Sequence, residues 1–417
     1  MTGELLVYVE SDALPRLIDY CDSRNLRRFY LVADQNTYRA LGKAVEEAMT
    51  GRGFDIKTIL LTGQEIVPDE RYIMQALLHV EPEDRVYLAV ASGTITDIVR
   101  FISHRTKTSF ISVPTAPSVD GYTSGGAPLV IGGLKQTVYT QPPMAVFGDL
   151  NTLCAAPRPM IAAGFGDMLG KYTALADWKL GRLLWDEPYS EAIAQRAWDA
   201  LQGCVQRVAE IGVASPEGIR SLMAGLIETG LCMLDFGASP PASGAEHYLS
   251  HYWEMKLLQE NRPAILHGAK VGVACILVAK FYEKIKQLTR QQAGEMLNAT
   301  SMPDREQELQ HIGIAYPAIA DKVIAEQKPF LELTEVAYSL LKQRIVDRWP
   351  EIQEIAAIVP SSQQLTDLLR QVGGPVTTRE LGLSDDEAAM AVEYTHYFRN
   401  RFSVMKLSRM LGIPLRL

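Results

Sequence analysis

Cysteine is scarce and scattered in this 417-residue chain. Its cysteines lie at irregular intervals without any CxxC or CxH spacing, at Cys21, Cys154, Cys204, Cys232 and Cys275. A disulfide framework uses an even number of cysteines and a cysteine metal site uses closely spaced pairs, so neither is predicted. We expect reduced, mostly buried thiols in a cytoplasmic protein.

Targeting and membrane-spanning segments are also lacking. The first residues, MTGELLVYVESDALPRL, contain no basic segment followed by an apolar core and a small-residue cleavage site, so we expect no secretory signal. The longest apolar run lies around VGVACILVA at 271–279, and it is about half of the ~20 residues needed to span a bilayer. The sequence predicts a protein that does not enter a membrane.

Positive charge is in deficit, because 41 lysines and arginines face 49 aspartates and glutamates, giving a net charge of −8 at pH 7. A protein whose main partner is nucleic acid or an anionic membrane usually needs a basic face, so the balance argues against both partners. A composition of 47% hydrophobic and 22% charged residues is typical of a globular protein. The length favours two domains.

Short β-branched runs alternate with amphipathic helical stretches in the first third of the chain. The runs are RRFYLVAD at 27–34, FDIKTILL at 54–61, DRVYLAVAS at 84–92 and TSFISVPT at 108–115. This alternation predicts a doubly wound, Rossmann-like parallel sheet. After MAVFGDLNTL at 144–153 the strand signal ends, and helical spacing follows. We therefore predict an α/β domain at 1–155 and an all-helical domain at 156–417.

Two smaller elements complete this outline. Within 121–150, IGGL lies between two alternating apolar stretches and predicts the turn of a β-hairpin. The C-terminal RNRFSVMKLSRMLGIPLRL is basic but also apolar at helical spacing. We expect a helix packed on the body of the protein rather than a nucleic-acid-binding tail.

A dinucleotide site is suggested by the residues that follow the predicted strands. Gly93, Thr94 and Asp97 open a helix after VYLAVAS, where free amides and the helix dipole can hold a pyrophosphate. The junction lacks a full GxGxxG pattern, so an ordinary turn between strand and helix is the alternative. Asp34 ends an early strand and is either a ribose ligand or a helix N-cap.

A third loop, PTAPSVDGYTS at 114–124, is dense in hydroxyl groups. Thr115, Ser118 and Ser124 surround one acid, Asp120. Open α/β sheets bind ligands at the carboxyl ends of their strands, although a loop of Pro, Ser and Gly is often only a connection. Because the three loops follow strands of one sheet, we expect them to converge.

Histidine is also scarce, and two of the seven lie four residues apart in GAEHYLSHYWE at 244–254. Pro240 and Pro241 stop any earlier helix, and Ser243 with Glu246 forms a capping-box pattern. His247 and His251 then lie on one helical face. The order EHxxxH has no glutamate between the histidines, which excludes the zinc-protease pattern HExxH.

A catalytic metal usually needs three protein ligands and an open position. His267 begins another apolar helix after NRPAI, and Asp167 follows two glycines in AAGFGDMLGKYTALADWKL at 162–180. Asp167 is either a ligand or the N-cap of a helix starting there. Lys171 is either a phosphate ligand or, as we expect, a lysine on a helix surface.

The ordered motifs SGTITD, PTAPSVDGYTS, GFGDMLGKYTALADWKL, GAEHYLSHYWE and LHGAKVG resemble those of the sn-glycerol-1-phosphate dehydrogenase family. This family is part of the superfamily of glycerol dehydrogenases, iron-dependent alcohol dehydrogenases and dehydroquinate synthase. The likeness runs from about residue 30 to 285. One departure is Ala91-Ser92-Gly93, where the family more often begins with glycine.

The resemblance implies a dehydroquinate synthase-like fold, with the active site in the cleft between the two domains. It implies NAD(P) as cofactor, with Asp34 on the ribose, with Gly93, Thr94 and Asp97 on the pyrophosphate, and with Thr115, Ser118 and Ser124 beside the nicotinamide. It assigns Asp167, His247 and His267 to one divalent metal ion, zinc, with nickel or iron as alternatives. It assigns Asp120, Asp167 and His251 to catalysis.

The implied reaction is the reversible reduction of dihydroxyacetone phosphate, a small-molecule phosphate substrate, to sn-glycerol 1-phosphate in phospholipid metabolism. A homodimer is also implied. The alternatives are a polyol dehydrogenase, a cyclase like dehydroquinate synthase, and a nucleotide-binding module without catalysis. DGYTS at 120–124 resembles the phosphate-specific branch, and IGGLKQTVYT at 131–140 lacks the glycine-lysine signature of the cyclase.

Overall fold

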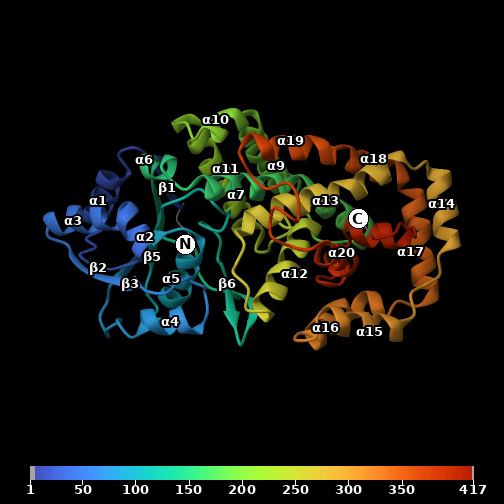
Figure 1. The fold of residues 1–417 in the computed structure, drawn as a ribbon, viewed down its shortest axis with the longest axis horizontal. Coiled ribbons are helices and arrows are strands. Elements are labelled where there is room, and N and C mark those ends of the chain that lie inside the picture. The colour runs from blue at the N-terminus through green and yellow to red at the C-terminus, as the bar shows by residue number, and fades with distance from the viewer. Residues whose placement is uncertain (1–4, 416–417) are drawn as a thin grey trace. The chain divides into compact units, whose positions relative to one another are not determined.

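The computed structural model describes residues 5–415, which divide into two compact units (Figure 1). One unit consists of Met1–Phe165 and Gln202–Gly237, and the other of Gly166–Leu201 and Ala238–Leu417. The chain therefore enters the first unit a second time, at Gln202–Gly237. A single boundary after residue 155 does not describe this second segment. Within residues 5–415, no helix is both long and apolar enough to cross a membrane.

The first unit is built on a six-stranded parallel sheet with the order β1-β8-β5-β4-β2-β3. An antiparallel hairpin of β6 and β7 adds a second sheet. The strands are β1 (Leu6–Glu10), β2 (Arg28–Asp34), β3 (Asp55–Leu61), β4 (Val86–Ala91), β5 (Phe110–Pro114), β6 (Gly126–Ile131), β7 (Leu134–Tyr139) and β8 (Ala145–Asp149).

Helices cover both faces of this sheet (Figure 1). The helical elements of the first unit are α1 (Ala13–Ser23), α2 (Gln35–Thr37), η1 (Tyr38–Gly42), α3 (Lys43–Gly51), α4 (Glu70–Leu77), α5 (Gly93–Arg105), α6 (Leu150–Cys154), α10 (Val208–Gly212) and α11 (Pro216–Phe236). Two further helices, α7 (Arg158–Leu169) and α9 (Glu191–Gln206), are divided between the units.

The doubly wound prediction is confirmed by the side chains of β2. Phe29 and Leu31 pack in a cluster with α1 and α3, whereas Tyr30 and Val32 pack in a second cluster with α4 and α5. Successive residues of a strand point to opposite faces, so a strand covered on both sides is apolar at every position. This is why the sequence showed continuous apolar runs.

The edge strand β1 has no counterpart among the predicted strands. Its five residues are exposed or half-buried, so its sequence lacks the continuous apolar run of the central strands. The predicted hairpin is confirmed: Gly132 and Gly133 form its turn with φ of 59° and 75°. Glycine adopts these left-handed values without steric cost.

The segment Gln202–Gly237 belongs to the sheet unit because α11 packs on it. Arg220 makes a two-pronged ion pair with Glu10 of β1, with both distances 2.9 Å. Thr123 Oγ1 donates a hydrogen bond to the Ile227 carbonyl at 3.0 Å. The end of the strand signals could not indicate that α11 belongs to the sheet unit. Its tertiary contacts place it there, and its own sequence pattern is simply that of a helix.

The second unit is all helical, as predicted (Figure 1, green to red). Besides parts of α7 and α9 it contains α8 (Lys171–Trp185), α12 (Ala245–Gln259), α13 (His267–Gln287), α14 (Arg290–Ala299), α15 (Arg305–Ala315), α16 (Ala320–Leu331), α17 (Glu335–Asp347), α18 (Trp349–Ala357), α19 (Ser362–Gln371), α20 (Asp385–Tyr394), η2 (Thr395–Tyr397) and α21 (Val404–Met410). The buried face of α21 confirms the packed C-terminal helix, although residues 416–417 lie outside the described part.

The cysteines are free thiols, as expected, and only Cys154 is partly exposed. Burial raises the pKa of the thiols of Cys21 and Cys204 to about 12. Since the thiolate is the reactive form, these two side chains are chemically inert near neutral pH.

Gly164 of α7 tests how closely this helix packs within the first unit. A Cβ atom there would lie 1.9 Å from the Pro117 carbonyl oxygen, whereas a Cβ on Gly313 of α15 would meet nothing within 4 Å. We predict that Gly164→Ala lowers the melting temperature and reduces the free energy of unfolding by about 1–3 kcal/mol or more. Gly313→Ala, the matched control, should stabilise by about 0.5–1 kcal/mol. Calorimetry of both variants measures this, and equal shifts would contradict the close packing.

Candidate metal centre and dinucleotide site

Asp167 lies near the carboxyl end of α7 and is fully buried. The interpretation of Asp167 as the N-cap of a helix is therefore wrong, because the helix begins nine residues earlier at Arg158. The two glycines before Asp167 lie inside this helix. A Cβ on Gly166 would lie 2.4 Å from the Gly268 carbonyl oxygen, so glycine permits the close approach of α7 and α13. This approach brings Asp167 to the amino end of α13, where His267 is the first residue.

Helix α12 begins at Ala245, close to the predicted start, but its N-cap is Gly244. The predicted capping box with Ser243 is wrong, since no side chain caps the helix from that position. Two acids satisfy the first amides instead. Glu246 Oε1 accepts from the Gly244 N–H at 2.7 Å, and Asp177 Oδ2 accepts from the Ala245 N–H at 2.8 Å. The start of α12 is thus fixed by buried carboxylates.

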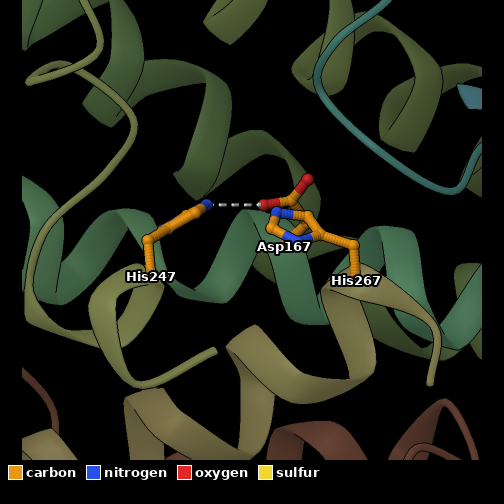
Figure 2. A group of neighbouring side chains, drawn as sticks. All are labelled: Asp167, His247 and His267. Carbon is orange, nitrogen blue, oxygen red and sulfur yellow. Dashed lines mark ion pairs between the residues drawn. The ribbon is translucent and has the colours of Figure 1, made fainter. Parts of the chain in front are cut away.

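These helices bring Asp167, His247 and His267 together (Figure 2). One ligand atom from each residue lies within 4.8 Å of the other two, a spacing that could hold one metal ion. His247 Nε2 is 3.5 Å from Asp167 Oδ1, the contact dashed in Figure 2. The ring centroids of His247 and His267 are 5.3 Å apart. Two imidazoles and one carboxylate form the donor set of many zinc, iron and nickel sites.

The hydrogen bond between His247 and Glu246 is typical of a histidine that binds a metal. His247 Nδ1 lies 2.7 Å from Glu246 Oε1, on the side of the ring away from Asp167. A histidine that ligates a metal through one ring nitrogen usually donates from the other to a carboxylate or carbonyl, which fixes the ring and strengthens the ligand. Glu246 also accepts from the Thr173 hydroxyl at 2.6 Å and is fully buried. The sequence pattern indicated only a capping role for Glu246, although an acid directly before a candidate ligand histidine was an available signal for this contact.

Electrostatics in this centre favour a cation. Although burial lowers it, the pKa of His247 is raised to about 9 by hydrogen bonds with Asp167 and Glu246. Burial raises the pKa of Asp167, but the charge of Lys171 and the His247 contact outweigh burial and hold that pKa well below its usual range. The carboxylate is therefore ionised at neutral pH, as a metal ligand must be.

Lys171 is not a surface lysine, so that expectation is wrong. Its side chain is fully buried, with Nζ 3.1 Å from both Asp167 Oδ1 and the Ala242 carbonyl oxygen. A buried ammonium needs such an anionic partner. Helical periodicity did not reveal this burial because α8 is covered by the protein on nearly every side.

His251 lies one turn after His247, as predicted, and its ring stacks on His267 with centroids 5.8 Å apart. It does not belong to the three-residue group. His251 Nδ1 is 3.4 Å from Glu254 Oε2, and Glu254 Oε1 is 3.5 Å from Lys270 Nζ. Glu254 and Lys270 were not predicted from the sequence; they lie one turn after His251 and His267, respectively.

In the first unit, the predicted dinucleotide residues follow the neighbouring strands β2, β4 and β5. The order of the strands therefore places the three loops side by side at the carboxyl ends of the strands, as expected. We call this the ligand-binding edge of the sheet. Gly93 opens α5, and a Cβ there would lie 3.0 Å from Val119 of the 114–124 loop. Thr94 occupies the second position of this helix.

Asp34 and Asp97 make contacts within the protein. Asp34 is the N-cap of α2, since its Oδ1 accepts from the Asn36 and Thr37 amides at 2.8 Å. Asp97 forms an ion pair with the buried Arg100. Burial raises the pKa of Asp97 to about 7, against the lowering effect of Arg100.

The hydroxyls of the 114–124 loop differ in environment. Ser118 Oγ lies 2.6 Å from Ser92 Oγ, which joins the loop to the start of α5. Ser124 Oγ donates to the Gly121 carbonyl of its own loop at 3.3 Å and to the carbonyl of Gly126, the first residue of β6, at 3.4 Å. Thr115 and Asp120 are buried.

Comparison with known proteins decides the family. The chain is 37% identical to glycerol-1-phosphate dehydrogenase [NAD(P)+] of Bacillus subtilis (strain 168) over 96% of its length and 90% of the relative. It is 32% identical to the enzyme of the same name from Pyrococcus furiosus, over 63% of this chain and 75% of the relative. The chain belongs to the glycerol-1-phosphate dehydrogenase family. The resemblance found in the ordered motifs is thereby confirmed.

Two further comparisons agree with this family and with the fold. A family model described as iron-containing alcohol dehydrogenase matches residues 8–157 of this chain. The crystal structure of a probable glycerol dehydrogenase from Sinorhizobium meliloti 1021 aligns with a TM-score of 0.61, over 98% of this chain and 95% of the other. At 15% identity, this likeness shows the fold alone.

Glu246 offers a direct test of the centre. In Glu246→Gln, one carbonyl oxygen replaces two carboxylate oxygens that accept from His247, Gly244 and Thr173. We predict that affinity for zinc falls about 10–100-fold, the usual effect of losing a partner behind a metal ligand. Competition with a chromogenic chelator measures the dissociation constant.

The matched control is Glu308→Gln. Glu308 is a buried carboxylate of the same unit that pairs with Arg409 and Tyr397 instead of a candidate ligand. This variant should lose stability and keep its zinc affinity. Unchanged zinc affinity in folded Glu246→Gln would show that Glu246 does not orient a metal ligand.

Proposed function

We propose that the protein catalyses the reversible, NAD(P)-dependent and metal-dependent reduction of dihydroxyacetone phosphate to sn-glycerol 1-phosphate. The observation that carries the proposal is the near full-length relationship to proteins named glycerol-1-phosphate dehydrogenase [NAD(P)+]. The group of Asp167, His247 and His267 supports it, because its donors suit a divalent cation. NADH or NADPH, when bound, would supply the hydride that C2 of the ketone accepts, and a proton would complete the new hydroxyl.

Asp167, His247 and His267 are the proposed ligands of one divalent metal. When bound, the ion supplies Lewis acidity that polarises the ketone and stabilises negative charge developing on its oxygen. Zinc is the proposed ion, with nickel and iron as alternatives, because this donor set accepts all three. Glu246 fixes the orientation of His247, and Lys171 balances the charge of Asp167.

His251 and Asp120 are the proposed substrate contacts. His251 is partly exposed, with 24% of its side chain accessible, while its ring stacks on His267. Its imidazole can therefore hydrogen-bond a substrate hydroxyl close to the ligand group. Glu254 Oε2 lies 3.4 Å from Nδ1 of this ring and helps to orient it. Asp120 lies in the loop after β5, at the ligand-binding edge of the sheet.

The cofactor is proposed to lie at that edge of the sheet. Gly93, Thr94 and Asp97 begin α5, whose first amides and helix dipole attract a pyrophosphate. The proposed nicotinamide contacts are Thr115, Ser118 and Ser124. Asp34 is the proposed ribose ligand, and its charge opposes a 2′-phosphate, so NADH should be preferred to NADPH.

We also propose a cytoplasmic homodimer. The free thiols agree with a reducing compartment, and the dimer is carried over from the family resemblance. Light scattering after size exclusion at micromolar concentration tests the dimer, and a monomer mass would contradict it.

The central test is oxidation of NADH by zinc-supplemented protein, with dihydroxyacetone phosphate and with dihydroxyacetone, each with and without a chelator. We predict chelator-sensitive turnover of the phosphate substrate only. His267→Ala should reduce turnover by more than about 10²–10³-fold, because it removes a proposed ligand of the charge-stabilising ion, and should retain NADH binding. His79→Ala, which changes an exposed histidine of the first unit, should retain full activity.

Three outcomes would contradict the proposal. Equal rates with both ketones would favour a polyol dehydrogenase. No turnover with either ketone would favour a cyclase if zinc and NADH bind, or a nucleotide-binding module if zinc does not bind. Normal activity of His267→Ala would remove the metal assignment.

A further inference from the structure

Arg100 is a buried arginine that hydrogen-bonds to segments of the candidate dinucleotide site. It lies in the second turn of α5, and its side chain is fully buried. Its guanidinium donates to three backbone carbonyls, those of Gly121 at 2.5 Å, Tyr122 at 3.2 Å and Gly126 at 3.0 Å. The fourth acceptor is Asp97 Oδ1, three residues earlier in α5, at 2.5 Å.

These four acceptors belong to separate parts of the site. Asp97 lies on the helix whose amino end is proposed to hold the pyrophosphate. Gly121 and Tyr122 follow Asp120 in the loop proposed to contact nicotinamide and substrate, and Gly126 begins β6. One planar guanidinium therefore joins the helix, the loop and the hairpin. A lysine has a compact ammonium and no fork of donors, so it cannot reach all four acceptors together.

The same loop touches α5 at a second point, next to Gly93. Ser118 Oγ contacts Ser92 Oγ at 2.6 Å, and a Cβ on Gly93 would lie 3.0 Å from Val119. The loop is thus held against the amino end of α5 by Ser118 and Val119, and against its second turn by Arg100. Loosening the Arg100 attachment would let the loop move away from the point where the pyrophosphate is proposed to bind.

We propose that Arg100 is a positioning residue of the NAD(H) site, which holds the 114–124 loop in its cofactor-binding conformation. The inference rests on the proposed function, because that function supplies NAD(H) as the ligand. Arg100 acts through the loop backbone and through Asp97, whose negative charge it balances beside a site for an anionic group. Preorganised loops bind more tightly because less conformational entropy is lost on binding.

The first test compares Arg100→Lys with Arg85→Lys. Arg85 is also a buried arginine of the first unit, paired with Asp55 at 2.6 Å and Glu83 at 2.9 Å. It precedes β4, at the amino ends of the strands and away from the ligand-binding edge. Both variants exchange a forked, ion-paired donor for a lysine, so both should lose some thermal stability.

NADH binding then separates the two roles. Titration of NADH fluorescence, without substrate, should give a dissociation constant about tenfold higher in Arg100→Lys, because hydrogen bonds to a charged group are lost. The constant should be unchanged in Arg85→Lys. Zinc affinity should be unchanged in both, since the proposed ligands belong to the other unit. Both titrations are made well below the melting temperature of each variant.

A second comparison guards against misfolding caused by an unpaired Asp97. Asp97→Asn is compared with Asp97→Asn/Arg100→Met, in which neither buried charge remains. The double variant should bind NADH about tenfold more weakly than Asp97→Asn, because the three carbonyls lose their donor. Any effect of Asp97 itself cancels in this comparison.

NADH affinity within twofold of wild type in folded Arg100→Lys, and equal affinity of the two Asp97→Asn variants, would overturn the inference. A parallel loss of NADH affinity in Arg85→Lys would assign Arg100 to stability alone, which also overturns it. If wild-type protein binds no NADH, the proposed function fails and the inference fails with it. Wild-type binding with unaffected Arg100 variants would overturn the inference alone.

Discussion

The buried carboxylate of Glu246 is the constraint on which the candidate metal centre depends. Its two oxygens accept from His247, from the Gly244 amide and from Thr173. A carboxylate out of water is stable only with such donors, so the helix start and the imidazole are held by one group. Asp177 extends this arrangement, since it accepts from Ala245, Tyr282 and the Val404 amide. The amino ends of α12 and α21 are thereby fixed to α8 and α13.

Arg100 in the sheet unit follows the same principle with the opposite charge. A guanidinium without solvent needs acceptors for its N–H groups, and the backbone of the 121–126 segment supplies three carbonyls to its two terminal nitrogens. In both places an irregular segment of chain is held by a buried charge rather than by apolar contacts. Apolar packing tolerates small shifts, whereas hydrogen bonds to a charge fix distance and direction. This property suits segments that must hold a ligand.

Much of the fold could be predicted from sequence because its signals are local. Central strands such as β2 are buried on both faces and are therefore apolar throughout their buried part, which in β2 is FYLVA at 29–33. The Gly132-Gly133 turn is equally local, since left-handed backbone favours glycine. The edge strand β1 and the return of α11 to the sheet unit could not be predicted in this way. Their placement depends on partners distant in sequence, such as the ion pair of Arg220 with Glu10.

The site was predictable in its residue types but less so in its local structure. Spacing placed His247 and His251 on one helical face, and only the family resemblance separated ligand from neighbour. Gly166 before Asp167 favoured a helix that starts only at Asp167, because glycine weakens helices. In the structure, Gly166 lies inside α7. A glycine is needed at this position because a side chain would collide with the Gly268 carbonyl oxygen of α13. The error has a physical origin: a residue that is unfavourable for its own helix is favourable for the packing of two.

The charges of the centre are interdependent because all of them are buried. Asp167, Lys171, Glu246 and His247 each have an ionic partner among the other three. Removing any one leaves another charge in a medium of low polarity, which is more costly than the lost contact itself. A substitution here therefore changes the free energy of unfolding and the ligand geometry together. Metal affinity and stability must be measured separately, and paired substitutions that preserve the charge balance are needed to divide the two effects.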